Sequence, residues 1–491
     1  MPQTSPRHRM NFCTGLFRNC YAAAAIFAML ALTGCGVAGP PPAGAADTPG
    51  AATTAGAAAT PGAAPNAGAA AAEGAADGPD AGASTPGTAP ARPHVLTAPA
   101  RYPAAREARV EELLSSMSLE RKVSQLLIVE LSSPQTGGAL VELGPSSLER
   151  LRRLQPGGIV LYGGNIESVE QTTALIADAG ATAELPLFVA VDEEGGLVSR
   201  LRHLGPGEAM RLPSAAAVGA TGDAVLAYRA GRALGTELRA LGFNMNFAPV
   251  VDVAEPGANP FLDSRAYSGD PELVARLSAA FLRGLQNRGV SAAVKHFPGH
   301  GTAAEDSHYG VATVSADVQR LSRVDWLPFR EAVRAGTDAI MVGHLVVPAL
   351  TGDATPASVS PAVLEEAARG ELGFEGLLIS DAVTMGGLSD VLEGRGAAVS
   401  VVAAGGDVVL TPANPERARD AIIEAVSAGR LDEARIDASV RRILRVKIDR
   451  GILVPEGELF ERRFRRLRTL DPAEVLAAPG HRKIVETIRT P

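Results

Sequence analysis

The sequence has few cysteines and no long run of basic residues, and each shortage excludes a class of protein. Three cysteines in 491 residues (Cys13, Cys20 and Cys35) are too few for a disulfide-built scaffold or a cysteine-rich zinc module. A net charge of −8 without clustered cations argues against nucleic acid as the main partner, because phosphate binding needs grouped positive charges. With 46% hydrophobic residues, however, the chain can bury at least one large core.

The N-terminal segment reads as a secretion signal. Three arginines precede an apolar run at residues 21–32, which ends in the tetrapeptide L-T-G-C at 32–35. Twelve apolar residues are too few for a bilayer-spanning helix, but they suit the core of a signal peptide. The tetrapeptide resembles a bacterial lipobox, in which the cysteine is lipidated after cleavage. We therefore expect residues 1–34 to be a lipoprotein signal peptide and Cys35 to anchor an exported protein to the extracytoplasmic face of a membrane.

Residues 35–100 consist almost entirely of Ala, Gly, Pro and Thr. Such a segment offers too little apolar surface to offset the entropy of ordering, so we expect a low-complexity, disordered linker. No later hydrophobic stretch reads as a membrane span. The charged residues 456–491 are too few for a second domain and are interpreted as a tail or a closing helix.

The body, at residues 105–455, alternates short apolar runs with amphipathic stretches. Strands are expected at 125–131, 158–162, 187–192, 243–253, 292–297, 339–347, 377–381 and 408–410. Helical periodicity is found between most of them, at 168–181, 224–241, 272–288, 325–335, 361–372 and 415–428. Nearly continuous apolar strands separated by helices indicate a parallel sheet that is covered on its faces.

Eight such units predict an α/β fold, specifically a (β/α)8 TIM-type barrel. A Rossmann fold would need a G-x-G-x-x-G turn between a strand and its helix. Gly157 and Gly158 precede their strand, and Gly195 and Gly196 lack that spacing. The doubly wound alternative is therefore weak.

Ionisable residues recur where the expected strands end. The expected strands three to seven end in Asp192, Asp252, Lys295 with His296, His344 and Asp381, respectively. In a barrel of this kind the chemistry lies at the carboxyl ends of the strands. Any one of these residues alone could be structural, but five in register predict a common site at the barrel mouth.

The stretch K-H-F-P-G-H-G at 295–301, followed by D-S-H at 306–308, is the most informative motif. Its Pro and Gly residues prevent a regular helix and predict a loop that leaves strand five. Three histidines and an aspartate could suggest a metal site. The H-E-x-x-H spacing is absent, however, and no H-x-H pair follows the first strand, so we expect neither a metal nor a cofactor.

Two further clusters are candidates for ligand contact. The first is the D-E-E-G-G run at 192–196 with Arg200, and the second is the N-P-F-L-D-S-R segment that ends in Arg265. A carboxylate at a strand end can accept hydrogen bonds from sugar hydroxyls, and a nearby arginine can donate others. Taken alone, each cluster could equally be a charged surface loop.

Together these stretches resemble glycoside hydrolase family 3, and within it the NagZ-type β-N-acetylhexosaminidases. The resemblance spans about residues 110–450 and includes V-D-E-E-G-G-x-V-x-R (191–200), N-P-F-x-x-x-R (259–265), the histidine loop and I-S-D-A-x-x-M (379–385). The histidine loop is the specific element, because other branches of the family lack it. The family's barrel fold agrees with the strand count.

The resemblance implies a role for each matching residue. Asp381 would be the nucleophile and His308 the general acid/base, with Asp306 orienting His308. The terminal N-acetylglucosamine would be held by Asp192, Arg200, Arg265, Lys295 and His296. Members are retaining, metal-independent exo-enzymes, so the expected partner is a terminal β-N-acetylglucosaminide from peptidoglycan or chitin fragments, and we expect a monomer.

Three alternatives stay open at this point. Asp192 and Glu193 could form the carboxylate pair of a substrate-assisted hydrolase, in which the acetamide of the sugar acts as nucleophile. Some relatives pass the glycosyl group to phosphate, which makes a phosphorylase or another β-glycoside-cleaving enzyme possible. The non-enzymatic alternative is a sugar-binding lipoprotein, which gives no reason for the D-S-H loop.

Overall fold

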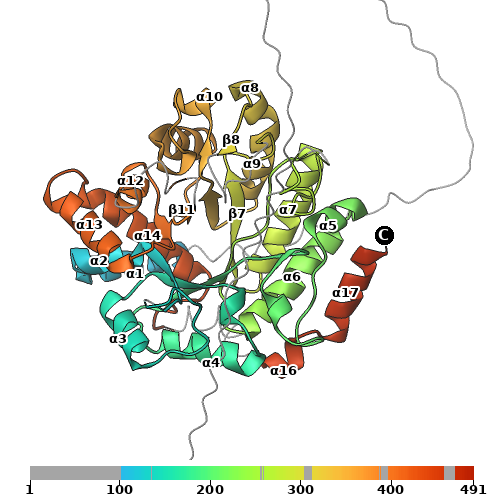
Figure 1. Cartoon of the computed structure of the whole chain (residues 1–491), viewed down its shortest axis with the longest axis horizontal. Coiled ribbons are helices and arrows are strands. Elements are labelled where there is room, and N and C mark those ends of the chain that lie inside the picture. The colour runs from blue at the N-terminus through green and yellow to red at the C-terminus, as the bar shows by residue number, and fades with distance from the viewer. Residues whose placement is uncertain are drawn as a thin grey trace, which may run out of the picture. The chain divides into compact units, whose positions relative to one another are not determined.

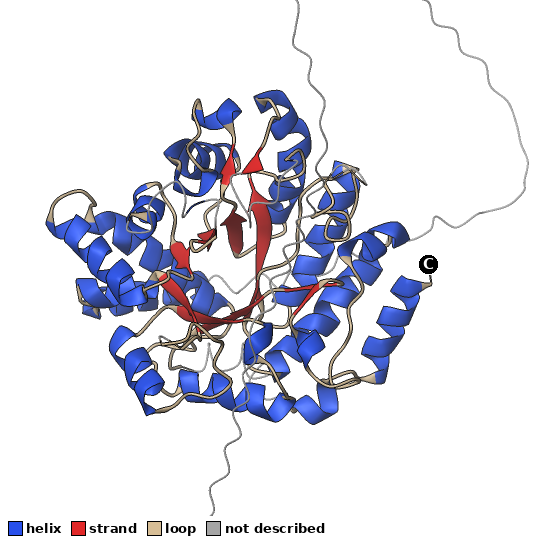
Figure 2. Ribbon diagram, viewed as in Figure 1, coloured by secondary structure: helices blue, strands red, loops and turns tan. Residues whose placement is uncertain are grey.

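The architecture is a closed barrel of parallel strands enclosed by helices (Figures 1 and 2). The computed structural model describes residues 101–133, 135–254, 257, 259–303, 312–385, 388, 396–457 and 470–490. The barrel strands are β1 (Leu127–Glu130), β2 (Gly158–Leu161), β3 (Phe188–Val191), β6 (Met245–Asn246), β7 (Ser291–Phe297), β9 (Ala339–Val342), β11 (Leu377–Ala382) and β12 (Val408–Leu410). β1 pairs with both β2 and β12, which closes the barrel. The predicted (β/α)8 fold is confirmed.

Each expected strand contains a barrel strand, but five of these barrel strands are shorter than the sequence indicated, three of them by more than one residue at one end. Gln125 ends helix α2 instead of opening β1, and β6 covers only two residues of 243–253. The stretch 339–347 divides into β9 and β10 (Leu345–Val346), and β10 pairs with β8 (Ala312–Thr313) outside the barrel. Apolar composition marks a buried segment whether or not it is a strand. It therefore does not show where the hydrogen bonding of a strand ends.

The helices lie on the outside of the strands, as Figure 2 shows. All six expected helices are present, as α4 (Val169–Gly180), α6 (Ala224–Ala240), α7 (Pro271–Gln286), α9 (Trp326–Arg334), η5 (Ala362–Glu371) and α13 (Pro415–Ser427). Their starts follow local chemistry: Ser168, Asp223, Asp270 and Asn414 each accept a backbone N–H of the first turn. Further helices include α1 (Arg101–Ser116), α2 (Leu119–Gln125), α3 (Pro145–Leu154), α5 (Ala215–Thr221), α12 (Ala397–Ala403) and α14 (Glu433–Asp449).

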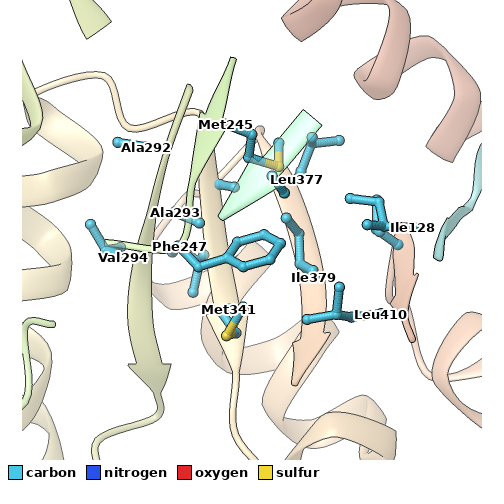
Figure 3. Packing of buried hydrophobic residues seen from close by; sticks show 14 of the residues in the cluster. Ile128, Met245, Phe247, Ala292, Ala293, Val294, Met341, Leu377, Ile379 and Leu410 are labelled. Carbon is cyan, nitrogen blue, oxygen red and sulfur yellow. The ribbon is translucent and has the colours of Figure 1, made fainter. Parts of the chain in front are cut away.

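Large apolar side chains fill the barrel interior. Figure 3 shows Phe247, Met341 and Ile379 gathered in the space that the strands enclose, and each is at most 2% exposed. A filled interior leaves no channel through the barrel, so a ligand can reach the strands only at their ends. Any site at the mouth therefore lies on top of these packed apolar side chains.

The chain ends of the described body pack on its outer helices. α1 begins at Arg101, before the expected start of the body at residue 105, and Tyr102 donates a hydrogen bond to Asp449 of α14 (3.0 Å). α17 (Pro479–Arg489) packs on α5 and α6, and His481 lies 2.7 Å from the buried carboxylate of Glu237. No helix in the described part of the chain is long and apolar enough to cross a membrane.

Candidate active site

The predicted site residues come from five strands that are neighbours in the barrel. Asp192 follows β3, Lys295 and His296 lie in β7, and Asp381 lies in β11. Between these strands, β6 leads to Asp252 and Arg265, and β9 is followed by His344. The expectation that the strand-end residues meet at one mouth is thus consistent with the barrel order.

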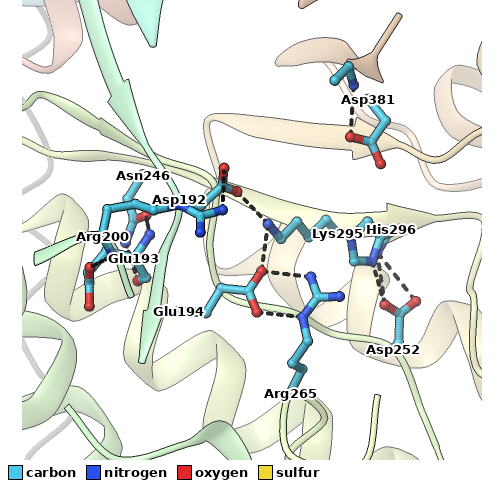
Figure 4. A network of polar contacts seen from close by, with 11 residues as sticks. Asp192, Glu193, Glu194, Arg200, Asn246, Asp252, Arg265, Lys295, His296 and Asp381 are labelled. Carbon is cyan, nitrogen blue, oxygen red and sulfur yellow. Dashed lines mark hydrogen bonds and ion pairs between the residues drawn. The ribbon is translucent and has the colours of Figure 1, made fainter. Parts of the chain in front are cut away.

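A network of buried charges joins three of these strands (Figure 4). The Lys295 ammonium lies 2.8 Å from Asp192 Oδ1 and 2.7 Å from Glu194 Oε1. Arg265 forms a two-point contact with Glu194, at 2.8 Å from Nε to Oε2 and 2.7 Å from Nη2 to Oε1. Lys295, Glu194 and Arg265 are each at most 8% exposed. Burial of this kind is tolerated only because opposite charges face one another.

The network fixes the charge state of its members. Burial alone would raise the pKa of Glu194, but Lys295 and Arg265 outweigh it and hold that pKa well below its usual range. Burial would lower the pKa of Lys295, but Asp192 and Glu194 raise it above its ordinary value. These groups therefore stay ionised across the neutral pH range and present fixed donors and acceptors.

A short hairpin brings Arg200 back toward Asp192. It consists of β4 (Glu193–Gly195) and β5 (Val198–Ser199). The fully buried carboxylate of Glu193 accepts the backbone N–H groups of Arg200 (2.7 Å) and Leu201 (2.9 Å). Burial raises the pKa of Glu193 to about 7. The hairpin places Arg200 Nη2 3.8 Å from Asp192 Oδ2, and both side chains keep partial exposure to solvent.

The consecutive residues Lys295 and His296 both reach the site, although neighbours in a regular strand point to opposite faces. The pairing of β7 with β9 shifts register between Val294 and Phe297, and such an irregularity re-aims side chains. His296 Nδ1 lies 2.7 Å from Asp252 Oδ2. No pattern in the sequence signals this shift.

Asp381 stands apart from the ion-pair network in Figure 4 and is partly exposed. Its Oδ1 accepts the backbone N–H of Ala382 (2.8 Å), and His344 Nε2 lies 3.0 Å from the carbonyl oxygen of Ala382. Burial would raise the pKa of Asp381, but the charges of His296, His344 and Lys295 and the Ala382 N–H lower it. The carboxylate is therefore ionised and available as a nucleophile or a base.

Three of the predicted functional residues cannot be located. Asp306, His308 and Cys35 lie outside the described residues. Conversely, Glu194 and Asp252 are central contacts of the site, although no role was expected for either. Glu194 is expected only as part of the D-E-E-G-G run, and Asp252 only as the end of a strand. Across the described ranges, no group of three or more His, Cys, Asp or Glu side chains could hold a metal ion.

Residues 118–446 match the glycosyl hydrolase family 3 N-terminal domain. The chain belongs to glycosyl hydrolase family 3. The resemblance inferred from the motifs is thus confirmed, and with it the assignment to the glycoside hydrolases.

Individual relatives refine the comparison. The chain is 37% identical over 252 residues to a beta-hexosaminidase of Stenotrophomonas maltophilia, which covers 51% of this chain and 74% of that protein. It is 32% identical over 338 residues to beta-hexosaminidase A of Pseudoalteromonas piscicida, covering 63% of this chain but only 56% of that protein. Among solved structures, a family 3 β-N-acetylglucosaminidase from Paenibacillus superposes with a TM-score of 0.68 at 36% identity, covering 76% of this chain and 68% of the other.

The charge network makes a prediction about stability. Glu194→Gln removes the carboxylate that faces two buried cations, so the free energy of unfolding should fall by about 3 kcal/mol or more. Urea denaturation followed by the fluorescence of Trp326, the single and fully buried tryptophan, measures this change.

The matched control is Glu433→Gln. Glu433 also pairs with a lysine, at 2.9 Å from Lys122, but its side chain is 49% exposed. Exposed pairs contribute little, so this variant should lose less than about 1 kcal/mol. Equal losses in the two variants would contradict the importance of the buried network.

Proposed function

We propose that the protein is a retaining exo-β-N-acetylglucosaminidase in which Asp381 attacks the anomeric carbon. The observation that carries the proposal is an ionised, partly exposed carboxylate at the end of β11, beside a set of fixed polar groups from neighbouring strands. A retaining glycosidase needs such a carboxylate to form the covalent glycosyl-enzyme. The family membership and the names of the relatives support the reaction and the sugar.

The charge network is suited to hold a neutral sugar. Asp192 and Arg200 keep partial exposure, so the carboxylate can accept hydroxyl protons while the guanidinium donates to ring substituents. Lys295 is more deeply buried and serves as donor and counter-charge between the carboxylates of Asp192 and Glu194. Arg265 and His296 complete the proposed set of sugar contacts. Because the groups are pre-ordered by ion pairs, little ordering entropy is lost when the sugar binds.

His308 is the proposed general acid/base, with Asp306 as its orienting partner. In the first step the imidazolium protonates the leaving oxygen while Asp381 bonds to the anomeric carbon. In the second step the neutral imidazole takes a proton from water, which displaces Asp381 and restores the starting state. An imidazole has an ordinary pKa near neutrality, so it can serve both steps. This assignment rests on the D-S-H motif.

The geometry argues against substrate-assisted hydrolysis by Asp192 and Glu193. The Glu193 carboxylate is fully buried and is occupied by two backbone N–H groups, whereas Asp192 contacts Lys295. The two carboxylates thus take separate partners and do not form a pair around a common acetamide.

Two variants should respond differently to the leaving group. Asp381→Asn should reduce kcat/KM at least about a thousand-fold on both phenyl and 2,4-dinitrophenyl N-acetylglucosaminides, because both need the nucleophile. His308→Ala should lose about 100- to 10,000-fold on the phenyl glycoside and far less on the dinitrophenyl glycoside, which departs without protonation. Steady-state kinetics with the two substrates measures this.

Asp178→Asn serves as the control, because Asp178 is exposed on α4, and its rates should be unchanged. Near-normal turnover by Asp381→Asn on either substrate would refute the role of Asp381. Sugar 1-phosphate formed in phosphate buffer would show a phosphorylase, and sugar binding by the wild-type protein without turnover would show a binding protein.

The proposed setting is the extracytoplasmic face of a membrane, with Cys35 lipidated and peptidoglycan or chitin fragments as substrate. The lipobox-like tetrapeptide supports the anchor. Cys35→Ser should then move the protein from the membrane fraction to the soluble fraction. Equal membrane retention of the two forms would contradict lipidation at this residue.

A further inference from the structure

Asp252 is a fully buried carboxylate with no assigned role in the proposed reaction. It lies beyond β6, where the backbone runs beside β7 and Val251 N–H donates to the carbonyl of Lys295 (2.8 Å). Its oxygens accept from three groups: the backbone N–H of His296 (3.2 Å), the ring of His296 (2.7 Å) and the backbone N–H of His300 (2.8 Å). All three contacts are with the start of the histidine loop.

These contacts determine which nitrogen of the His296 ring donates a hydrogen bond. Burial would raise the pKa of Asp252, but His296, His300 and the backbone N–H of His300 lower it, so the carboxylate is ionised. An ionised carboxylate only accepts hydrogen bonds, and therefore Nδ1 of His296 must be the donor.

Charged groups surround His296 on several sides. Asp252 lies against Nδ1, and Lys295 and His300 belong to its own chain segment, the two imidazole centroids being 5.9 Å apart. Of the groups that lower the pKa of Asp381, His296 has the largest effect, followed by His344. Burial lowers the pKa of His300, and His296 and Arg265 lower it further, whereas Asp252 opposes them. Asp252 is thus the carboxylate in direct contact with the His296 ring, and Asp381 is the one whose pKa that ring lowers.

We propose that Asp252 is a positioning residue that fixes the orientation and the tautomer of the His296 ring, with Nδ1 as the donor. The inference deepens the proposed function, because it depends on His296 as a sugar contact. Asp252 acts through His296 and touches no reacting atom. In Figure 4 no dashed contact joins His296 and Asp252 to the network of Lys295, Glu194 and Arg265.

Asp252→Asn tests the proposal, because the amide keeps the size of the side chain and an acceptor oxygen but loses the charge. Because an amide can turn either its oxygen or its NH2 group toward Nδ1, the His296 ring should lose its fixed orientation, and KM should rise about ten-fold or more with a smaller change in kcat. The assay uses the dinitrophenyl glycoside, for which protonation by His308 is not needed.

Asp407→Asn is the matched control. Asp407 is equally buried but lies directly before β12, at the opposite end of the strands, where it contacts Arg369 and Arg442. Its variant should lose stability while KM keeps its wild-type value. If Asp252→Asn lowers kcat and leaves KM unchanged, as a loss of folded protein would, the proposal is overturned.

A second measurement needs no variant of Asp252. Nitrogen-15 NMR of histidine-labelled wild-type protein, with the His296 signals assigned by their loss in His296→Asn, should show Nδ1 protonated at neutral pH. A bare Nδ1 would overturn the proposal. Absence of turnover by the wild-type protein would instead refute the proposed function and leave this NMR result readable.

Discussion

The structure depends on one electrostatic constraint: charges of both signs are taken out of water at the barrel mouth and must neutralise each other there. Lys295 lies between Asp192 and Glu194, and Glu194 in turn engages Arg265 through both oxygens. Each side chain comes from a different strand or loop. The ion pairs therefore fix the relative positions of β3, β7 and the loop after β6. In the proposed function they also order the sugar-binding groups before the sugar binds.

A second, smaller pairing lies next along the chain from Lys295. Asp252 and His296 face each other, and no contact drawn in Figure 4 joins them to the larger network. In the proposed function the larger cluster supplies fixed donors and acceptors for the sugar, whereas Asp252 holds the His296 ring in its orientation. A filled barrel interior supports both from below.

The fold was predictable from the sequence because eight buried strands and their intervening helices have distinct apolar periods. The positions of Asp192, Lys295 and Asp381 at strand ends were equally readable. The contact partners were not. Which carboxylate of the 192–194 run faces Lys295 depends on the β4–β5 hairpin, and the joint arrival of Lys295 and His296 depends on a register shift in β7. Both are set by long-range pairing, which leaves no local pattern in the chain.

The central claim is that Asp381 forms a covalent bond to the sugar, and trapping that intermediate tests it most directly. The protein is treated with a 5-fluoro N-acetylglucosaminyl fluoride, digested and examined by peptide mass spectrometry. The peptide that contains Asp381 should gain the mass of one fluorinated glycosyl group, with fragmentation placing it on that residue. Loss of activity with the label on a different carboxylate, or turnover that a thiazoline blocks while no labelled peptide forms, would contradict it.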